Sequence, residues 1–420
     1  MKKVVALCMV VVLVMGLSAG FATSKVKDEE MKVMADGDYI NLENQLIVKE
    51  KIVYVPLRSI FEALGGTVTW DATTNSIEVA YNGKTSIVKM VNNPAIIVEN
   101  SVSMIAYDEI EKVFDAEVRI DGEKNLLLIN KAFEPFSAYT FDHYVRYDQI
   151  PKKAVSMNAH TTELMLALGL EDYLIGTAYN NAKILPEYEE TFNKIPVLAE
   201  KYPSFEVLLD SEADFVFGRS SVFTSSYKCA TLEEMLKQDI GVYVAKASYT
   251  QNADFNDVYE DFKTIGKVFN VENESALMVE DMQMKIANVA GKVNTMRPVK
   301  VFVYDFGSDK AFTAGKSLET YIIQTAGGKN VFDDINKTWS YVNWETVVDR
   351  NPDYIVINDY GNTTAQEKID YLKSLPMLQS VNAIKNNHFV VVTLPSVFPG
   401  VRVDEAVENI AKGLHPTAFK

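Results

Sequence analysis

Apolar and polar positions in the C-terminal two thirds of the chain form a repeating pattern. Between residues 153 and 244, apolar runs of four to six residues alternate with amphipathic stretches, and the alternation starts again after Pro298. Short buried strands that alternate with helices are typical of a parallel sheet covered by helices. We therefore predict two α/β lobes, residues 151–271 and residues 297–420.

A long amphipathic segment joins the two predicted lobes. Met282, Ile286, Val289 and Val293 recur at 4-3-4 spacing on one helical face, in a segment without proline. A helix of about 20 residues is roughly 30 Å long, which is enough to run from one lobe to the next. We predict a bridging helix over 272–296, which permits far less hinge motion than a flexible connector.

Residues 32–130 contain two copies of one unit, at an offset of 50 residues. The aligned pairs include Val55 with Ile105, Ile60 with Ile110, Leu64 with Phe114 and Val68 with Val118. Each unit is typical of a short strand, a helix and an alternating strand. Neither copy could bury its apolar face alone, so we predict a small α+β domain built from two repeats. Residues 131–150 have no clear period and are predicted to be a linker.

The first 22 residues have the order of a secretory signal. Lys2 and Lys3 precede an apolar run over 4–17, and small residues follow it. The alternative, a retained membrane anchor, needs about 20 apolar residues, and this run is shorter. We expect export, with cleavage near Ala22. Cys8 follows Leu7 and precedes most of the apolar run, so we expect no lipobox and no acyl anchor.

Composition excludes several classes of function. The 420 residues are 48% hydrophobic, and 57 acidic against 41 basic side chains give a net charge of −16. Such a surface repels phosphate backbones, so we expect no nucleic-acid partner. Cys8 and Cys229 are the only cysteines and allow no disulfide framework, and no Cys/His cluster has metal-ligand spacing. We expect no metal site and no resident cofactor.

Catalytic motifs are incomplete. Residues 314–317, Ala-Gly-Lys-Ser, are similar to the end of a phosphate-binding loop, but Lys310 stands where that loop needs a glycine. No Gly-x-Ser-x-Gly elbow is present, and four histidines do not supply a serine–histidine–acid set at strand ends. We therefore predict a protein without enzymatic activity and without catalytic residues.

Two glutamates occupy matching positions in the two lobes. Glu206 and Glu345 each fall in the first turn of a predicted short helix, eight residues before the aspartates Asp214 and Asp353 that open the next strand. A carboxylate there could simply complement the helix dipole, worth a few tenths to about 1 kcal/mol. The sequence pattern alone leaves this interpretation and a functional one open.

Residues 147–420 resemble the ferric-siderophore and cobalamin class of ABC-transporter substrate-binding proteins. The motifs are Val-Ser-Met-Asn at 155–158, Tyr-Pro-Ser-Phe-Glu at 202–206, Ala-Gly-Gly-Lys-Asn-Val-Phe at 326–332 and Pro-Gly-Val-Arg at 399–402. The resemblance implies a class III binding protein whose lobes hold a metal chelate. It also implies that Glu206 and Glu345 dock on arginines of an ABC permease dimer.

The N-terminal repeat is similar to the stalk domain named after the copper amine oxidase N-terminus, common in Gram-positive surface proteins. Tyr-Val-Pro-Leu-Arg at 54–58 and Val-Thr-Trp-Asp at 68–71 carry this resemblance. The second copy departs from it, with Ala106 for the proline and Asp115 for the first glycine. The segment holds no histidine or cysteine, so we interpret it as a spacer or a module in contact with the cell wall.

A pocket between lobes of this kind lies at the carboxyl ends of the parallel strands. The candidate ligand-binding residues follow the predicted strands of both lobes: Asn158, His160, Tyr179, Arg219, Phe223, Tyr304, Phe306, Lys316, Tyr360, Phe398 and Arg402. Aromatic faces with a few cations suit a bulky, partly anionic chelate. Other interpretations stay open: Tyr304 and Phe398 in the core, His160 as a helix cap, and Arg402 paired with Asp404 or Glu405.

The sequence thus predicts a secreted receptor that captures a ferric siderophore and presents it to a permease. The iron is expected to arrive already coordinated by its chelator. Cobalamin and haem are alternatives on the same scaffold, with His160 or Tyr179 as a possible axial ligand of haem. A surface protein with a purely structural role is the alternative from a different class.

Overall fold

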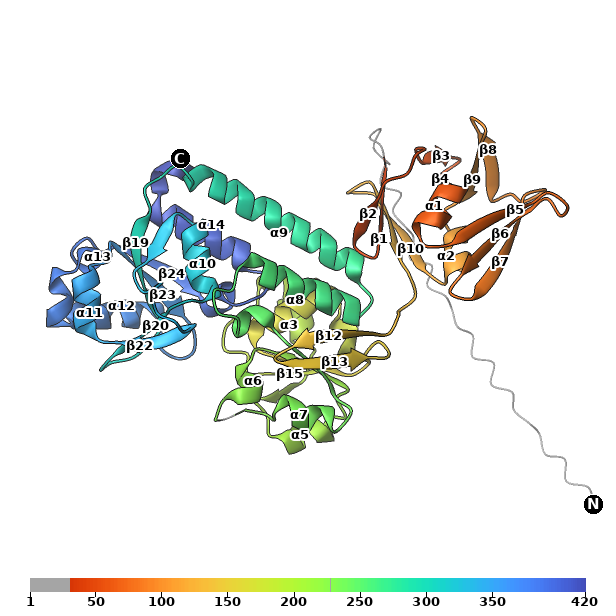
Figure 1. Ribbon diagram of the computed structural model, residues 1–420. Helices are drawn as coiled ribbons and strands as arrows, with labels where there is room; N and C mark the ends of the chain where they lie inside the picture. Colours follow the sequence, from red (N-terminus) through yellow and green to blue (C-terminus); the bar gives the residue numbers. More distant parts are fainter. Residues whose placement is uncertain (1–30, 227) are drawn as a thin grey trace, which may run out of the picture.

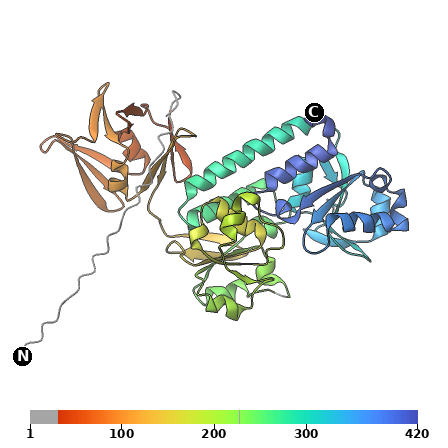
Figure 2. The same ribbon diagram turned by 180° about the vertical axis from the view of Figure 1, so that it is seen from behind.

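The computed structural model describes residues 31–226 and 228–420. The predicted signal peptide, residues 1–22, lies outside them. Figure 1 shows a small N-terminal domain beside two larger lobes, which the long helix α9 connects. Figure 2, from behind, shows α9 spanning both lobes along one side. Within the described part of the chain, no helix is both long and apolar enough to cross a bilayer.

The N-terminal domain is built from three small sheets and two short helices. Its sheets have the orders β10-β11-β1-β2, β3-β4-β9-β8 and β5-β6-β7. Its elements are β1 (Lys32–Ala35), β2 (Asp38–Ile40), β3 (Ile47–Lys49), β4 (Ile52–Pro56), α1 (Leu57–Ala63), β5 (Thr67–Asp71), β6 (Ser76–Tyr81), β7 (Lys84–Lys89), β8 (Ile96–Glu99), β9 (Val102–Ala106), α2 (Glu109–Phe114), β10 (Glu117–Asp121) and β11 (Leu126–Asn130).

The two predicted repeats are visible in these elements. The first copy runs through β4, α1, β5 and β6, and the second through β9, α2, β10 and β11. Strands β4 and β9 pair antiparallel, with Val55 directly opposite Ile105. These residues are equivalent in the two copies, so a local two-fold axis passes between them. The two helices share one core, where the rings of Phe61 and Phe114 meet edge to face at 5.4 Å.

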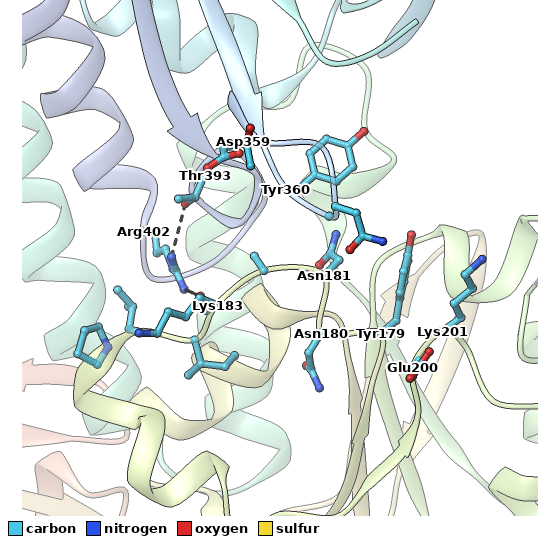
Figure 3. A pocket seen from close by; sticks show the side chains of 17 residues that line it. Tyr179, Asn180, Asn181, Lys183, Glu200, Lys201, Asp359, Tyr360, Thr393 and Arg402 are labelled. Carbon is cyan, nitrogen blue, oxygen red and sulfur yellow. Dashed lines mark hydrogen bonds between the residues drawn. The ribbon is translucent and has the colours of Figure 1, made fainter. Parts of the chain in front are cut away.

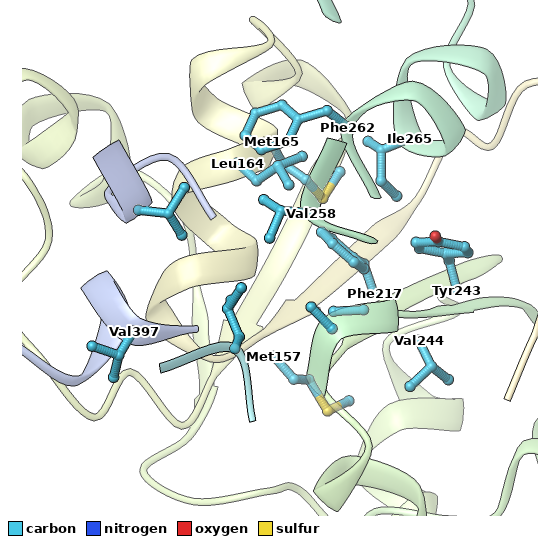
Figure 4. Packing of buried hydrophobic residues seen from close by; sticks show 14 of the residues in the cluster. Met157, Leu164, Met165, Phe217, Tyr243, Val244, Val258, Phe262, Ile265 and Val397 are labelled. Atoms are coloured by element: carbon cyan, nitrogen blue, oxygen red, sulfur yellow. The ribbon is translucent and has the colours of Figure 1, made fainter. Parts of the chain in front are cut away.

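The first lobe is a parallel sheet of five strands in the order β16-β15-β14-β17-β18. Its elements are β14 (Ala154–Met157), α3 (Ala159–Ala167), β15 (Leu174–Ala178), α4 (Pro186–Phe192), β16 (Val197–Ala199), α5 (Phe205–Asp210), β17 (Phe215–Gly218), α6 (Ser221–Thr224), α7 (Leu232–Leu236), β18 (Gly241–Val244) and α8 (Phe255–Val268). Figure 4 shows its core, in which Phe217 and Met157 from the strands and Val258 and Phe262 from α8 are buried.

The second lobe has a four-stranded parallel sheet, β21-β19-β23-β24, and a separate antiparallel pair, β20-β22. Its elements are β19 (Val299–Tyr304), β20 (Ala311–Ala314), α10 (Leu318–Thr325), β21 (Gly328–Asn330), β22 (Trp339–Val342), α11 (Trp344–Arg350), β23 (Tyr354–Asp359), α12 (Ala365–Ser374), α13 (Asn382–Lys385), β24 (Phe389–Thr393) and α14 (Val403–Leu414). The pair β20-β22 lies outside the predicted βαβ pattern and forms one wall of the site described below.

Helix α9 (Glu272–Val293) bridges the lobes and ends three residues before the predicted limit. The predicted face, Met282, Ile286, Val289 and Val293, is buried, and the helix packs on α8 of the first lobe and α14 of the second. The fold class is therefore confirmed: two α/β lobes joined by a long helix, preceded by a small α+β domain of two repeats.

The segment predicted to be a linker, 131–150, contains an antiparallel hairpin of β12 (Phe136–Thr140) and β13 (His143–Tyr147). The hairpin covers the free edge of the first-lobe sheet at β18. The Thr140 hydroxyl donates to the Val244 carbonyl and accepts from the Val244 amide, and the Tyr147 hydroxyl donates to the Val242 carbonyl at 2.8 Å. These side chains satisfy edge groups that would otherwise be exposed for strand pairing.

The N-terminal domain is docked on the first turns of α9. The Asn273 side chain is fully buried and accepts from the Gly37 amide at 2.8 Å. It also donates to the Ile129 carbonyl at 2.9 Å and to Asn130 Oδ1 at 2.7 Å. Gly37 adopts φ +84°, and a Cβ there would lie 3.0 Å from the Glu272 carbonyl oxygen, so only glycine fits.

Further contacts extend this docked surface along the helix. Leu277 packs against Met34, Leu126 and Leu128 of the N-terminal domain. Arg119 forms an ion pair with Glu274, and the Tyr39 hydroxyl donates to Glu280 at 2.9 Å. The N-terminal domain is therefore fixed to the bridging helix by an apolar patch with a hydrogen-bonded rim, and it does not hang on a free tether.

Replacing Asn273 with alanine is expected to loosen this docking. The change leaves three polar groups without their partner, at about 1–3 kcal/mol for each that stays buried. Hydrogen exchange should accelerate in β1 and at the start of α9 while the second lobe is unaffected. Gln283→Ala, on the exposed side of the same helix, is the control. Equal protection in both variants would contradict the role given to Asn273.

Candidate ligand-binding cleft

The carboxyl ends of the parallel strands of both lobes face a shared cleft. Three adjoining pockets of about 420, 440 and 840 Å³ make up this cleft, and Tyr360, which follows β23, lines all of them. Figure 3 shows the largest, with Tyr179 and Asn181 from the first lobe and Tyr360, Asp359 and Arg402 from the second. The site therefore needs both lobes.

The pocket of about 420 Å³, called the central pocket below, has one wall of three aromatic rings, those of Phe398, Trp339 and Phe312. His160 stacks on Phe398 with centroids 5.4 Å apart, and the plane of Phe398 lies 9° from that of Trp339, at 6.4 Å. Trp339 in turn stacks on Phe312 at 5.6 Å. Trp339 and Phe312 come from the antiparallel pair β20-β22, which holds the two rings side by side. The wall offers a flat apolar surface to a ligand.

Arg219 is the cation of the central pocket. Its guanidinium lies 5.1 Å from the centroid of the Phe398 ring and 5.6 Å from that of Tyr179. Its Nε donates to Ser221 Oγ at 2.8 Å and to the Tyr202 hydroxyl at 3.2 Å. These two acceptors orient the guanidinium, so it is held in place before a ligand binds.

An acidic residue, Asp305, lies across the same pocket. It follows β19 directly, is 5% exposed, and accepts a hydrogen bond from the Tyr360 hydroxyl at 3.0 Å. Burial raises the pKa of Asp305 to about 6, against the opposing influence of Lys368. The Lys368 ammonium lies 4.3 Å from the centroid of the Tyr360 ring. The second lobe thus brings a carboxylate, a phenol and an ammonium to the cleft.

Arg402 has a different partner from those proposed from the sequence. It does not pair with Asp404 or Glu405 but with Glu163 of α3, in the other lobe, through both carboxylate oxygens, with Nε to Oε2 at 2.8 Å. Glu163 is fully buried and Arg402 is 6% exposed. The Arg402 guanidinium also donates to the Lys183 carbonyl at 2.7 Å. Arg402 lines the largest pocket, but its charge is already balanced by this buried inter-lobe ion pair.

His160 lies behind the aromatic wall. It is 2% exposed and lies in the first turn of α3, two residues after the N-cap position that Asn158 occupies, so it is not the helix cap. Burial, and then the nearby charges of Arg219 and Arg402, lower the pKa of His160 well below its ordinary value, so the ring is neutral at physiological pH. Its buried position leaves it no direct path to a ligand.

The other predicted residues divide into those that reach the cleft and those that do not. Tyr179, Tyr304, Phe306 and Phe398 line its pockets, although the Tyr304 side chain is largely buried. Asn158, also buried, adopts φ +98° and its amide donates to the Tyr202 hydroxyl at 3.1 Å, which supports the Arg219 site. Phe223 belongs to the first-lobe core, and Lys316 is half-buried outside these pockets, where its carbonyl accepts from the Asn252 amide.

Sequence reasoning missed several residues of the central pocket, among them its acid, Asp305, and two of its aromatic residues, Phe312 and Trp339. Asp305 follows the predicted strand directly, so its position at a strand end was a usable signal. The two aromatics lie in short segments rich in aromatic and β-branched residues, Ala-Phe-Thr-Ala at 311–314 and Trp-Ser-Tyr-Val at 339–342. This composition favours strands and could have indicated an extra pair inserted into the βαβ pattern.

Glu206 and Glu345 lie in the first turns of α5 and α11, as expected. Both are exposed on their lobes. Neither forms an ion pair with another described residue of the chain. Val207 and Leu209, also on α5, are 41% and 38% exposed. The surface around Glu206 therefore combines a free carboxylate with apolar side chains.

A two-lobed fold with a ligand cleft at the strand ends defines a solute-binding protein. Residues 155–396 match the family model of the periplasmic binding proteins, and residues 34–129 match that of the copper amine oxidase N-terminal domain. The first match covers more than half of the chain, which therefore belongs to the periplasmic binding protein family. Both resemblances given above are confirmed.

Similar proteins come from several organisms. An uncharacterised ABC transporter substrate-binding lipoprotein of Bacillus subtilis is 27% identical over 64% of this chain and 82% of its own length. A cobalamin-binding protein of Halobacterium salinarum is 23% identical over 66% of this chain and 72% of its own. The family match and these relatives agree, and this chain is a substrate-binding protein of an ABC transporter and not an enzyme.

Solved structures share the fold. A periplasmic binding protein from Veillonella parvula has a TM-score of 0.62 and 32% identity over 67% of this chain and 98% of that one. A structure described as an ABC-type Fe³⁺-hydroxamate transport system from Saccharomonospora viridis has a TM-score of 0.59 and 21% identity, over 67% and 99%. At that identity the second likeness concerns the fold alone.

Removing one partner of the inter-lobe ion pair is expected to destabilise the protein strongly. Glu163→Ala leaves the Arg402 guanidinium buried without its carboxylate, which typically costs about 3–5 kcal/mol. Urea denaturation measures the loss, and Glu190→Ala, exposed on α4, is the control. Restoring apolar packing with Glu163→Met and Arg402→Met together should recover much of the stability. A single variant as stable as wild type would refute the importance of the pair.

Proposed function

We propose that this protein captures a metal chelate, a ferric siderophore, between its lobes and delivers it to an ABC permease. The observation that carries the proposal is the aromatic wall of Phe398, Trp339 and Phe312 with the Arg219 guanidinium beside it. Chelates of this kind present a broad organic shell around a coordinated metal, and flat rings with a few charged groups suit both parts.

The metal is proposed to arrive inside its chelate. Within the described residues, no group of three or more His, Cys, Asp or Glu side chains is placed to hold a metal ion. Among the two haem ligands considered from the sequence, buried His160 is poorly placed, whereas Tyr179 lines the cleft. Haem binding would therefore need Tyr179.

Binding can be followed through Trp339. The chain has three tryptophans, and Trp339 is the one that lines the cleft, whereas Trp70 lies in the N-terminal domain. Titration of the purified protein with ferric siderophores, cobalamin and haem should give saturable fluorescence quenching with a siderophore. Trp339→Phe should remove most of the quenching while keeping an aromatic ring in the wall.

Two further variants test the wall itself. Phe398→Ala should weaken affinity by roughly tenfold, because a stacked ring contributes about 0.5–1.5 kcal/mol beyond the area that it buries. Tyr144→Ala removes an exposed aromatic ring from β13, which lines none of the three pockets, and is the matched control. If none of the three ligand classes gave saturable binding, the proposed function would fail and a structural role at the cell surface would be favoured.

We also propose that Glu206 and Glu345 dock the two lobes on the two halves of a permease dimer. Their matching places at the helix starts of separate lobes, together with their exposure, support this role. Reversing both charges, Glu206→Lys with Glu345→Lys, should abolish chelate uptake by cells without changing affinity for the chelate. Reversal at Glu187 and Glu408, which are not in equivalent positions, is the control. Normal uptake by the double variant would exclude this docking mode.

The N-terminal domain is proposed to be a spacer or a module in contact with the cell wall. Its match to the copper amine oxidase N-terminal family supports the assignment of a stalk. Export through the predicted signal peptide is part of the same proposal.

A further inference from the structure

The charged side chains around the cleft are nearly balanced. The cations that line its three pockets are Lys183, Lys201, Arg219, Lys368 and Arg402, and the acids are Glu200, Asp305 and Asp359. Arg402 is already paired with Glu163. The central pocket contains one charge of each sign, Arg219 from the first lobe and Asp305 from the second. A ligand in this pocket meets no large excess of positive charge.

Asp305 is the acidic side chain held nearest to the aromatic wall. Its neighbour Phe306 stacks with Phe312 at 4.9 Å, and the Asp305 amide donates to the Phe312 carbonyl. The carboxylate is fixed from the other side by the Tyr360 hydroxyl. The position of the Asp305 carboxylate is therefore set by strands β19 and β20 and by Tyr360.

The groups that surround Asp305 leave it charged near neutral pH. Glu319 of α10 is fully buried behind it and accepts from the Asn358 amide at 3.2 Å. Burial raises the pKa of Glu319 to about 8 and that of Asp305 to about 6, so Asp305 is the more ionised of the two near neutral pH. Lys368 and Arg219 face Asp305 from α12 and from the first lobe. The negative charge of the central pocket thus resides on Asp305.

We propose that Asp305 determines which charge class of chelate the cleft accepts. Its buried carboxylate disfavours chelates with several negative charges and favours those that are neutral or that carry a cationic group. Two charges a few ångströms apart in a partly buried site interact far more strongly than in water, so one carboxylate is sufficient to discriminate. This inference rests on the proposed function and deepens it by naming the class of chelate.

The chemistry of iron chelates makes the distinction sharp. Three hydroxamates around Fe³⁺ give a neutral core, whereas three catecholates give a core with three negative charges. A triply anionic chelate would need several unpaired cations near the wall, and here Arg219 faces an acid of opposite charge. The preferred ligand is therefore a ferric trihydroxamate, and a free amine on it would be tolerated.

The test compares three ferric chelates with the full chain at pH 7.5. They are a neutral trihydroxamate, a trihydroxamate with a primary amine, and a tricatecholate. Wild type should bind both trihydroxamates more tightly than the tricatecholate. Asp305→Asn, whose amide oxygen can still accept from Tyr360, should improve tricatecholate affinity by about tenfold or more and weaken the amine-bearing chelate by about tenfold. Affinity for the neutral chelate should change less than threefold.

Controls separate this inference from the proposed function. Asp370→Asn, on the exposed part of α12, removes the same charge away from the cleft and should leave all three affinities unchanged. Asp305→Ala provides a second variant if the asparagine disturbs folding, which circular dichroism will show. If wild type binds none of the chelates, the proposed function fails. If it binds them but Asp305→Asn changes all three equally, or if wild type prefers the tricatecholate, the role of Asp305 is refuted.

Discussion

The geometry of the cleft depends on a buried ion pair between the lobes. Glu163 and Arg402 are 239 residues apart in the chain and meet through two hydrogen bonds, with the Lys183 carbonyl as a third acceptor. A buried pair of charges is tolerated only when its geometry satisfies both partners. The pair therefore fixes how α3 and the start of α14 approach each other. The stacking of His160 on Phe398 lies next to this contact and depends on the same register.

Elements with strong periodicity were predictable from the sequence, and contacts between distant elements were not. The face of α9, from Met282 to Val293, and the paired repeats around Val55 and Ile105 follow from local spacing alone. The hairpin at 136–147 was missed because its alternation is carried by aromatic and polar residues on a short ribbon. It becomes ordered by packing on the edge of another sheet.

The site was predictable in its location but not in its details. Tyr179, Arg219 and Tyr360 were predicted to line the cleft because each follows a predicted strand, and parallel strands place their carboxyl ends together. Phe223 follows a strand equally closely but turns into the core, and Trp339 enters the pocket from an antiparallel pair that the βαβ pattern does not anticipate. No spacing rule could pair Arg402 with Glu163, because long-range partners are set by the three-dimensional packing of the lobes.

The docked N-terminal domain has a consequence for how the receptor meets its transporter. Because Asn273 and Leu277 join this domain to α9, and α9 packs on both lobes, the three bodies turn as one unit. If the N-terminal domain is attached to another structure, the opening of the cleft keeps a fixed orientation relative to the point of attachment. The receptor then samples fewer orientations relative to the transporter before a productive encounter. The effective concentration of the cleft at the transporter is therefore raised by the fixed orientation of the receptor and not by the length of a tether.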